Sequence, residues 1–221
     1  MSSTTKIWDD GTWDGPTNMA RDVELLRAAE CGEVGARVYG WDKAWVSLGR
    51  FQTPERALRP DCIVPYVMRP TGGKAVLHGH DVTISLAAPL NTLDVKERSI
   101  ASVYRAIAEP LVAALNQAGV KAALAEQTAF VQSAGNMADC FAHVSPNDIV
   151  DPSSGLKVCG CALRVTATAV LAQCSVPASA PLIDPALVYD HPATYSQRAP
   201  QSHSAYVSAL LSTLGSLLVR G

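Results

Sequence analysis

The chain has 221 residues, of which 48% are hydrophobic and 17% are charged, and its formal net charge is -2. This length suffices for one domain with a full core, and the charge balance excludes a polybasic surface for nucleic acid. No apolar run approaches the roughly 20 residues of a membrane span, and the N-terminus lacks a basic segment followed by an apolar one. We therefore expect a single domain over residues 1–221, cytoplasmic, with no membrane or nucleic-acid partner.

The cysteines constrain the kind of site that the chain can carry. There are six, namely Cys31, Cys62, Cys140, Cys159, Cys161 and Cys174. They form no Cys-x-x-Cys pair and have no His-x-x-x-His partner, so the sequence predicts neither a zinc site nor a disulfide framework. We expect reduced thiols, one of them a candidate reactive group, and no metal.

The first half of the chain predicts one helix and several strands. Residues 17–32 start with a Thr/Asn cap candidate, carry apolar residues at helical spacing and stop at Gly32, a suitable C-cap. Residues 35–50 contain two short β-rich runs around "GWDK", whose Gly and Asp are typical of a hairpin turn. Residues 62–68 and 74–88 extend the series of strands.

The second half continues this mixture of helices and strands. Residues 95–119 have the i, i+3, i+4, i+7 pattern of an amphipathic helix, which Pro110 kinks or divides. After an irregular stretch, residues 155–166 and 169–177 predict a strand pair, and residues 204–220 predict a closing helix. Few helices interleaved unevenly with strands favour an α/β or α+β domain with a mixed central sheet.

The stretch "RPTGGK" places two adjacent glycines between two cations. Thr71, Gly72 and Gly73 can form a turn whose backbone amides approach a ligand, with Arg69 and Lys74 flanking the turn. Charge-assisted hydrogen bonds from such a turn suit a phosphate, a carboxylate or a polarised carbonyl. A plain hairpin turn with two solvated charges explains the same residues, and for an isolated glycine pair it is the simpler interpretation.

A second candidate site joins Cys140 to Lys157. A thiolate is a nucleophile for acyl transfer, and a nearby ammonium favours the thiolate and can hold an acyl oxygen. Gly160, in the strand that Lys157 begins, permits close approach of the backbone. Without other information, Cys140 is more simply a small buried apolar residue, and packing explains Cys159 and Cys161.

Two histidines lie close to the glycine turn. We expect His78 and His80 on one strand face, where they are candidate acid/base groups or metal ligands. No carboxylate cluster completes a metal shell, so a structural or substrate-lining role is favoured for both. His143, three residues after Cys140, is placed to assist the thiol, although the polarity of the loop explains it equally well.

Together these segments resemble the lipoate-protein ligase and octanoyltransferase family, whose catalytic domain is related to biotin protein ligase. Four segments match in the family order over residues 16–177, namely "TNMARDVELL", "RVYGWDKAWVSLGRFQ", "RPTGGKAVLHGHDVTISLA" and "CFAHVSPNDIVDPSSGLKVCGCALRV". The resemblance implies a biotin/lipoate protein ligase-like fold, a mixed central β-sheet flanked by helices. It implies that Lys157 holds the acyl carbonyl, and that an acyl pocket is formed by Arg69, Thr71, Gly72, Gly73, Lys74, His78 and Gly160.

Within the family, the "CF" dipeptide at Cys140 resembles the cysteine-dependent octanoyltransferases more than the ATP-dependent ligases. The resemblance implies that Cys140 takes an octanoyl group from octanoyl-acyl carrier protein. It then passes the group, without a cofactor, to a lysine of a lipoyl-domain protein such as glycine cleavage H protein. Two alternatives remain open: a lipoate-protein ligase that uses ATP and Mg, and an acyl-binding subunit without catalytic activity.

Two positions depart from the family pattern. Most relatives have a second arginine where this chain has Met68, and a glycine where it has Cys174. The missing charge at Met68 favours thioester chemistry slightly, because a phosphate ligand would use that charge. Nothing in the sequence explains Cys174.

Overall fold

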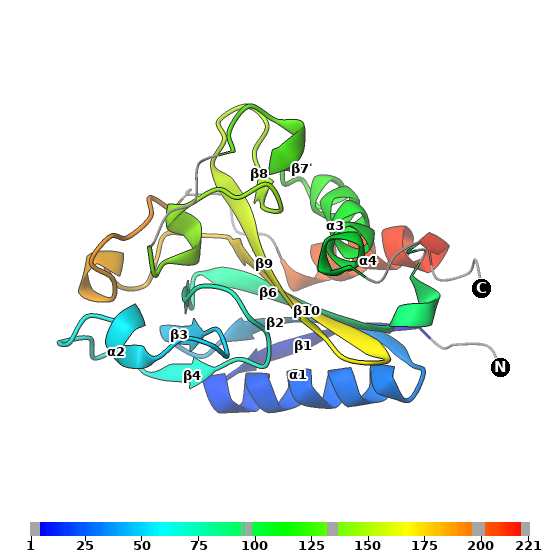
Figure 1. The fold of residues 1–221 in the computed structure, drawn as a ribbon, viewed down its shortest axis with the longest axis horizontal. Coiled ribbons are helices and arrows are strands. Elements are labelled where there is room, and N and C mark those ends of the chain that lie inside the picture. Colours follow the sequence, from blue (N-terminus) through cyan, green and yellow to red (C-terminus); the bar gives the residue numbers. More distant parts are fainter. Residues whose placement is uncertain (1–4, 94, 96–98, 132–136, 196–201, 218–221) are drawn as a thin grey trace.

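The computed structural model describes residues 5–93, 95, 99–131, 137–195 and 202–217. Within these ranges one mixed sheet has the strand order β1-β2-β6-β10-β9-β8-β7 (Figure 1). Its strands are β1 (Thr5–Trp13), β2 (Val34–Trp41), β6 (Asp81–Pro89), β7 (Ala123–Leu124), β8 (Ile149–Val150), β9 (Lys157–Val165) and β10 (Ala169–Pro177). β1 and β2 are parallel, and the other neighbours are antiparallel. The expected mixed sheet and the β9–β10 pair are confirmed, whereas β1, β7 and β8 were not predicted.

A smaller sheet has the order β4-β3-β5, with β3 (Trp45–Leu48) between β4 (Tyr66–Met68) and β5 (Val76–His78). The predicted hairpin over residues 35–50 is therefore wrong, because β3 does not pair with β2. Both edges of β2 are occupied by β1 and β6. The "GWDK" segment carries the chain from one sheet to the other instead.

The helices cover both faces of the large sheet, α1 (Gly15–Glu30) on one and α3 (Ile100–Gln117) with α4 (His203–Leu217) on the other (Figure 1). The short helical segments are α2 (Pro54–Ala57), η1 (Leu90–Thr92), η2 (Ala125–Gln127), η3 (Cys140–Ala142) and η4 (Pro185–Leu187). α1 begins earlier than predicted, because the Asp14 carboxylate accepts the backbone N–H of Thr17 at 2.8 Å and caps the helix. Gly32 ends it as predicted, with φ +101. Pro110 does not divide α3.

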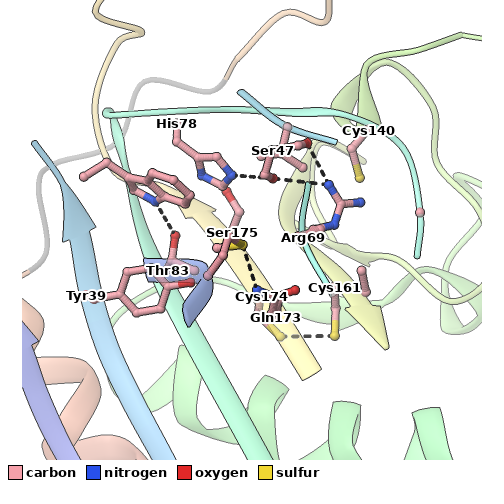
Figure 2. A pocket seen from close by; sticks show the side chains of 16 residues that line it. Tyr39, Ser47, Arg69, His78, Thr83, Cys140, Cys161, Gln173, Cys174 and Ser175 are labelled. Carbon is pink, nitrogen blue, oxygen red and sulfur yellow. Dashed lines mark hydrogen bonds between the residues drawn. The ribbon is translucent and has the colours of Figure 1, made fainter. Parts of the chain in front are cut away.

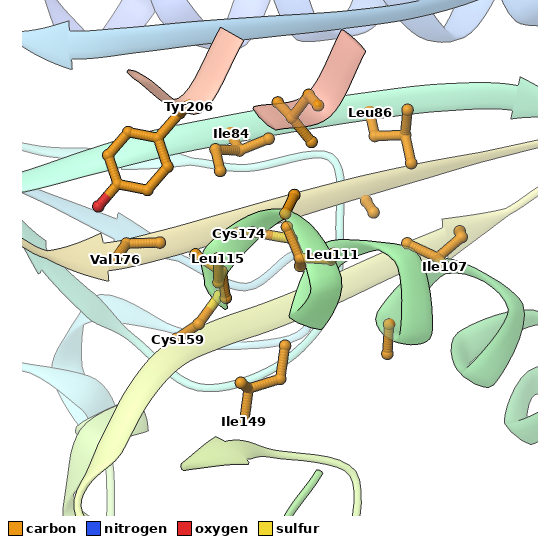
Figure 3. Close-up of a cluster of buried hydrophobic side chains, with 14 of the residues drawn as sticks. Ile84, Leu86, Ile107, Leu111, Leu115, Ile149, Cys159, Cys174, Val176 and Tyr206 are labelled. Atoms are coloured by element: carbon orange, nitrogen blue, oxygen red, sulfur yellow. The ribbon is translucent and has the colours of Figure 1, made fainter. Parts of the chain in front are cut away.

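Alternation along the strands separates the two layers of the core. On β10, Val170 and Val176 face the cluster of α3 and α4, whereas Leu171 packs on Leu25 of α1. Figure 3 shows Leu115 of α3 against the β10 side of this cluster. Burial of one such side chain stabilises the fold by about 1.5–3 kcal/mol. The large sheet is therefore held in place by packing on both of its faces.

The predicted strand over residues 74–88 is two strands, β5 and β6, divided at Gly79. Gly79 has φ +106, and a Cβ there would lie 2.9 Å from the Lys43 carbonyl oxygen. The turn ends β5 at His78 and leaves His80 outside both strands. The expectation that the two histidines share one strand face is therefore wrong. Among the described residues, no helix has the length and hydropathy to cross a bilayer.

Candidate active site

Residues from both sheets line one narrow cavity of about 40 Å³. β2, β3 and β5 supply one side, β9 and β10 supply another, and Cys140 reaches it from η3 (Figure 2). Five of the predicted site residues lie in this lining, namely Arg69, Gly73, His78, Cys140 and Gly160. The fold thus brings together segments that are far apart in the sequence, from Met19 to Ser175.

Cys140 is the first residue of η3 and is fixed from two sides. The Asp139 carboxylate accepts the backbone N–H of Phe141 at 2.9 Å, and the Cys140 N–H donates to the Ala75 carbonyl at 2.8 Å. The side chain is half-buried at the cavity wall rather than sealed in the apolar core. A Cβ at Gly160 would lie 3.2 Å from Cys140 Sγ, so the glycine lets β9 approach the thiol.

Lys157, the first residue of β9, lies directly against this thiol. Its Nζ is 3.3 Å from Cys140 Sγ, 2.9 Å from the Cys140 carbonyl oxygen and 2.7 Å from Asp148 Oδ1. Burial lowers the pKa of Lys157, but the negative charges of Cys140 and Asp148 outweigh burial and raise the pKa above its usual value. A permanently charged ammonium beside the sulfur can stabilise negative charge on the sulfur or on an acyl oxygen.

Arg69 is a clamp for the glycine turn. Its guanidinium donates to the carbonyl oxygens of Ser47 at 2.8 Å, Gly72 at 2.6 Å and Lys74 at 2.6 Å. Burial lowers its pKa, and the nearby sulfur of Cys140 acts in the opposite direction. Gly73 has φ +86, which a residue with a side chain rarely adopts. The predicted turn exists, but the N–H groups of Arg69 donate to groups of the protein and do not form an open anion site.

Four other predicted residues, namely Thr71, Gly72, Lys74 and Lys157, lie outside the lining of this cavity. Thr71 is fully buried and donates from Oγ1 to Gln173 Oε1 at 2.6 Å, and the Gly72 N–H donates to the Leu163 carbonyl at 3.3 Å. Lys74 takes part in the turn through its carbonyl oxygen. Lys157 lines a second cavity of about 270 Å³ behind Cys140. Direct contact of Thr71, Gly72 and Lys74 with a substrate stays a prediction.

The opposite side of the cavity holds polar residues that sequence reasoning missed. Ser47 Oγ lies 2.8 Å from His78 Nε2, and His78 Nδ1 lies 2.8 Å from Asp81 Oδ2. Trp41 stacks on the His78 ring, with 3.9 Å between centroids and an interplanar angle of 16°. The "HGHD" spacing was a signal for Asp81, since it follows His78 by three positions. Ser47 had no such signal, because its position depends on the pairing of β3 with β5.

A buried polar network closes the inner end of the cavity. The Tyr39 hydroxyl donates to Asp22 Oδ2 at 2.9 Å, and Asp22 also pairs with Arg37 at 2.7 Å. Burial, followed by the charge of Asp22, raises the pKa of Tyr39 well above its usual value. Gln173 donates to the same carboxylate. Tyr39 is thereby a fixed neutral hydroxyl in the cavity wall.

The model of the Lipoyl protein ligase A/B catalytic domain matches residues 14–218. The chain belongs to this family. Among its relatives, Octanoyltransferase LipM of Exiguobacterium sp. is 31% identical over 210 residues, which cover 89% of this chain and 74% of that protein. Octanoyltransferase LipM of Kyrpidia tusciae is 32% identical over 168 residues, which cover 72% and 60%. The matched part is 46% of the LipM of Symbiobacterium thermophilum, so the chain spans about half the length of several such relatives.

Solved structures of similar fold are consistent with membership of this family. A protein from T. acidophilum, determined with bound lipoic acid, has a TM-score of 0.72 and 19% identity to this lipoyl ligase A/B domain. The match covers 99% of this chain and 87% of that chain. The expected family and the expected lipoate/biotin ligase-like fold are therefore confirmed.

The histidines of this chain other than His78 are not part of the cavity lining. The His80 ring meets the Tyr195 ring edge-on at 4.9 Å, and neither ring nitrogen has a hydrogen-bond partner among the described residues. Burial lowers the pKa of His80. His143 lines the second cavity, and no hydrogen bond of the described residues joins it to Cys140. A helping role for His143 stays a prediction.

Met68 and Cys174, the two positions at which this chain departs from the family pattern, differ in burial. Met68 is 44% exposed at the end of β4. Cys174 on β10 faces Cys161 on β9 in register, with 3.1 Å between the sulfur atoms, and Figure 3 places it inside the core cluster. Hydrogen bonds with Cys159 and Cys161, together with burial, raise the pKa of Cys174 well above its usual value. Cys174 is therefore a neutral packing thiol.

Proposed function

We propose that this chain is an acyltransferase that moves an octanoyl group from octanoyl-acyl carrier protein to a lysine of a lipoyl-domain protein, such as glycine cleavage H protein. The group passes through a thioester on Cys140. The single observation that carries the proposal is the 3.3 Å distance between Cys140 Sγ and Lys157 Nζ at the wall of the cavity. The names of the LipM relatives support the same reaction. A cytoplasmic location is part of the proposal.

In the first step the Cys140 thiolate attacks the carbonyl carbon of the donor thioester. The new carbon–sulfur bond forms, the bond to the carrier breaks, and the carrier thiol leaves with a proton from solvent. Lys157 holds the negative charge that moves from sulfur to the carbonyl oxygen in the tetrahedral intermediate. Because Asp148 and the Cys140 carbonyl oxygen fix Nζ, little reorganisation is needed when that charge develops.

The acyl chain then lies in the cavity. Val76, Ala162 and Met19 offer it apolar surface, and burial of its methylenes at about 0.8 kcal/mol each supplies roughly 5 kcal/mol before the costs of binding. At about 40 Å³ the cavity is narrow, so we expect the unbranched Met19 side chain to move aside when the chain enters. In the second step the acceptor lysine attacks the thioester and releases Cys140.

A nucleotide assay separates this reaction from that of a lipoate-protein ligase with ATP and Mg, because a thioester donor needs no activation. Octanoyl-acyl carrier protein and apo glycine cleavage H protein should give octanoylated H protein without nucleotide. Lipoate-dependent exchange of pyrophosphate into ATP should be absent. Exchange that persists in Cys140→Ala would instead establish the ligase. Binding of octanoate without any transfer would establish a non-catalytic acyl-binding subunit.

A further inference from the structure

Ser47, His78 and Asp81 form a continuous series of hydrogen bonds at the cavity that Cys140 also lines. The distances are 2.8 Å from Ser47 Oγ to His78 Nε2 and 2.8 Å from His78 Nδ1 to Asp81 Oδ2. All three residues are buried, and both Ser47 and His78 line the cavity that holds Cys140 (Figure 2). The proposed transfer of the acyl group through Cys140, with Lys157 beside it, gives these three residues no role.

The Asp81 carboxylate determines which atoms of His78 and Ser47 carry the protons in these hydrogen bonds. Its Oδ2 accepts from the hydroxyls of Ser175 at 2.6 Å and Thr83 at 3.1 Å, and its Oδ1 accepts from the Gly79 N–H at 3.2 Å. A carboxylate with these donors is an acceptor only, so His78 Nδ1 carries the proton toward it. When the ring is neutral, Nε2 accepts the Ser47 O–H.

Arg69 connects this series of hydrogen bonds to the thiol. Its Nη1 lies 3.2 Å from Ser47 Oγ, and as a donor it leaves the hydroxyl proton of Ser47 directed at His78. The charge of Arg69 also interacts with the sulfur of Cys140. Arg69 therefore interacts with both the hydroxyl of Ser47 and the sulfur of Cys140, and all three residues line the same cavity.

The surroundings of His78 suit a ring that gains a proton. The face of Trp41 lies parallel to the imidazole at 3.9 Å, and an aromatic face attracts a cation. The Trp41 indole N–H donates to Thr83 Oγ1 at 2.9 Å, which fixes the stack. The Asp81 carboxylate lies on the other nitrogen, as an orienting carboxylate does for a histidine base.

The second half of the transfer requires such a base. A lysine acceptor is an ammonium near neutral pH and must lose a proton before its nitrogen can attack a thioester. Lys157 is a poor base, because its pairing with Asp148 and Cys140 raises its pKa. Arg69 remains a cation. Among the described residues that line the cavity, His78 is the one whose ring nitrogen can accept a proton through a hydroxyl, with Nε2 2.8 Å from Ser47 Oγ.

We propose that the hydroxyl of Ser47 relays a proton from the attacking amine to His78 Nε2, with Asp81 and Trp41 stabilising the imidazolium. The inference rests on the proposed function and adds the proton acceptor of its second step. The ammonium gives one proton to Ser47 Oγ while Ser47 gives its own to His78. The carbon–nitrogen bond forms, the carbon–sulfur bond breaks, and the second amine proton goes to the sulfur of Cys140. His78 then releases its proton to solvent.

Two acceptors test the relay on preformed acyl-enzyme. Wild type, His78→Gln and Ser47→Ala are loaded with octanoyl-acyl carrier protein, and loss of the octanoyl mass is followed in single turnovers. One acceptor is apo glycine cleavage H protein, whose lysine must be deprotonated. The other is hydroxylamine, which is largely unprotonated at neutral pH and attacks thioesters without a base. Ser85→Ala is the matched control, because Ser85 is a buried serine of β6 outside the cavity lining.

We expect all four proteins to load, which tests the proposed function separately. Transfer to H protein should fall about 10²-fold in His78→Gln and about tenfold in Ser47→Ala, whereas discharge by hydroxylamine should stay within about twofold of wild type. Equal slowing with both acceptors, or no slowing with either, would overturn the relay, because a distorted cavity affects both nucleophiles alike. A wild type that never loads would overturn the proposed function and the relay with it.

Discussion

The two sides of the cavity are built in different ways. The thiol side places a half-buried Cys140 on a short helical turn and holds it with one ammonium. The histidine side places Ser47 within β3, His78 at the end of β5 and Asp81 at the start of β6, all buried and joined by hydrogen bonds. The first arrangement leaves the sulfur free to take a new bond, and the second keeps a proton path in one geometry.

This difference indicates what each side contributes. A nucleophile has to change from a free to an acylated state, so a half-buried sulfur at the wall of the cavity is suitable. A proton acceptor works best when its neighbours are fixed before the reaction, because no energy is then spent on reorganisation. The small sheet supplies Ser47 and His78 on β3 and β5, the large sheet supplies Asp81 on β6, and η3 supplies Cys140.

The largest expected effect is on the thiol side, in Lys157→Met. Loss of the ammonium 3.3 Å from Cys140 Sγ should slow formation of the octanoyl adduct by about 10²- to 10³-fold. The measurement is adduct mass against time. Arg105→Met is the matched control, since the exposed pair of Arg105 with Glu126 lies away from the cavity. A rate in Lys157→Met within about threefold of wild type would remove Lys157 from the mechanism.

Acid unfolding tests the histidine side. Burial raises the pKa of Asp81, but the charge of His78 and hydrogen bonds from His78 and Ser175 lower it to about 2. Because the folded pKa lies below the usual value, Asp81 stabilises the fold above about pH 5, and about 2 kcal/mol of this is lost as the pH falls toward 2. The difference in unfolding free energy between wild type and Asp81→Asn should shrink over that range. A constant difference would show that Asp81 is not held as a carboxylate.

Gly160→Ala sharpens the geometry of the thiol side. Its new Cβ would lie 3.2 Å from Cys140 Sγ, while the backbone there is outside the left-handed region. The thiol has to shift by a few tenths of an ångström, and we expect adduct formation to slow about tenfold. The midpoint of thermal unfolding should change little. An unchanged rate would mean that the position of the sulfur is not critical.

The smallest expected effect is that of Cys174→Ala. Cys174 is 2% exposed and packs on Cys161, so its removal leaves a small void and should lower the unfolding free energy by about 1 kcal/mol. Its raised pKa keeps the thiol neutral, so the octanoyl adduct should form as in wild type. Chemical denaturation and intact mass measure the two outcomes. Loss of the adduct would show that a second thiol takes part.

Local patterns in the sequence were sufficient for much of the fold. Helical spacing predicted α1, α3 and α4, and alternation predicted the β9–β10 pair, because these features depend on neighbours in the chain. The pairing of β2 and β3 was mispredicted, since a turn signal says nothing about strands that already occupy both edges. β1 had no signal beyond ordinary composition.

The site divides in the same way. Cys140 and Lys157 came from family segments, and the structure places them in contact. Ser47 lies within a matching segment but has no pattern of its own. It meets His78 because β3 and β5 pair with Trp45 opposite His78 and Ser47 opposite Val76, which sets all four side chains on one face. Such a register depends on tertiary structure and has no signature in a single sequence.

The central claim is that an octanoyl group becomes attached to Cys140. Intact mass after incubation with octanoyl-acyl carrier protein, followed by peptide mapping, tests it most directly. We predict one added octanoyl group on Cys140 in the wild type and in Cys62→Ala, whose thiol lies outside the cavity lining, and no added group in Cys140→Ala. An adduct of unchanged amount in Cys140→Ala, or one mapped to another residue, would contradict the account.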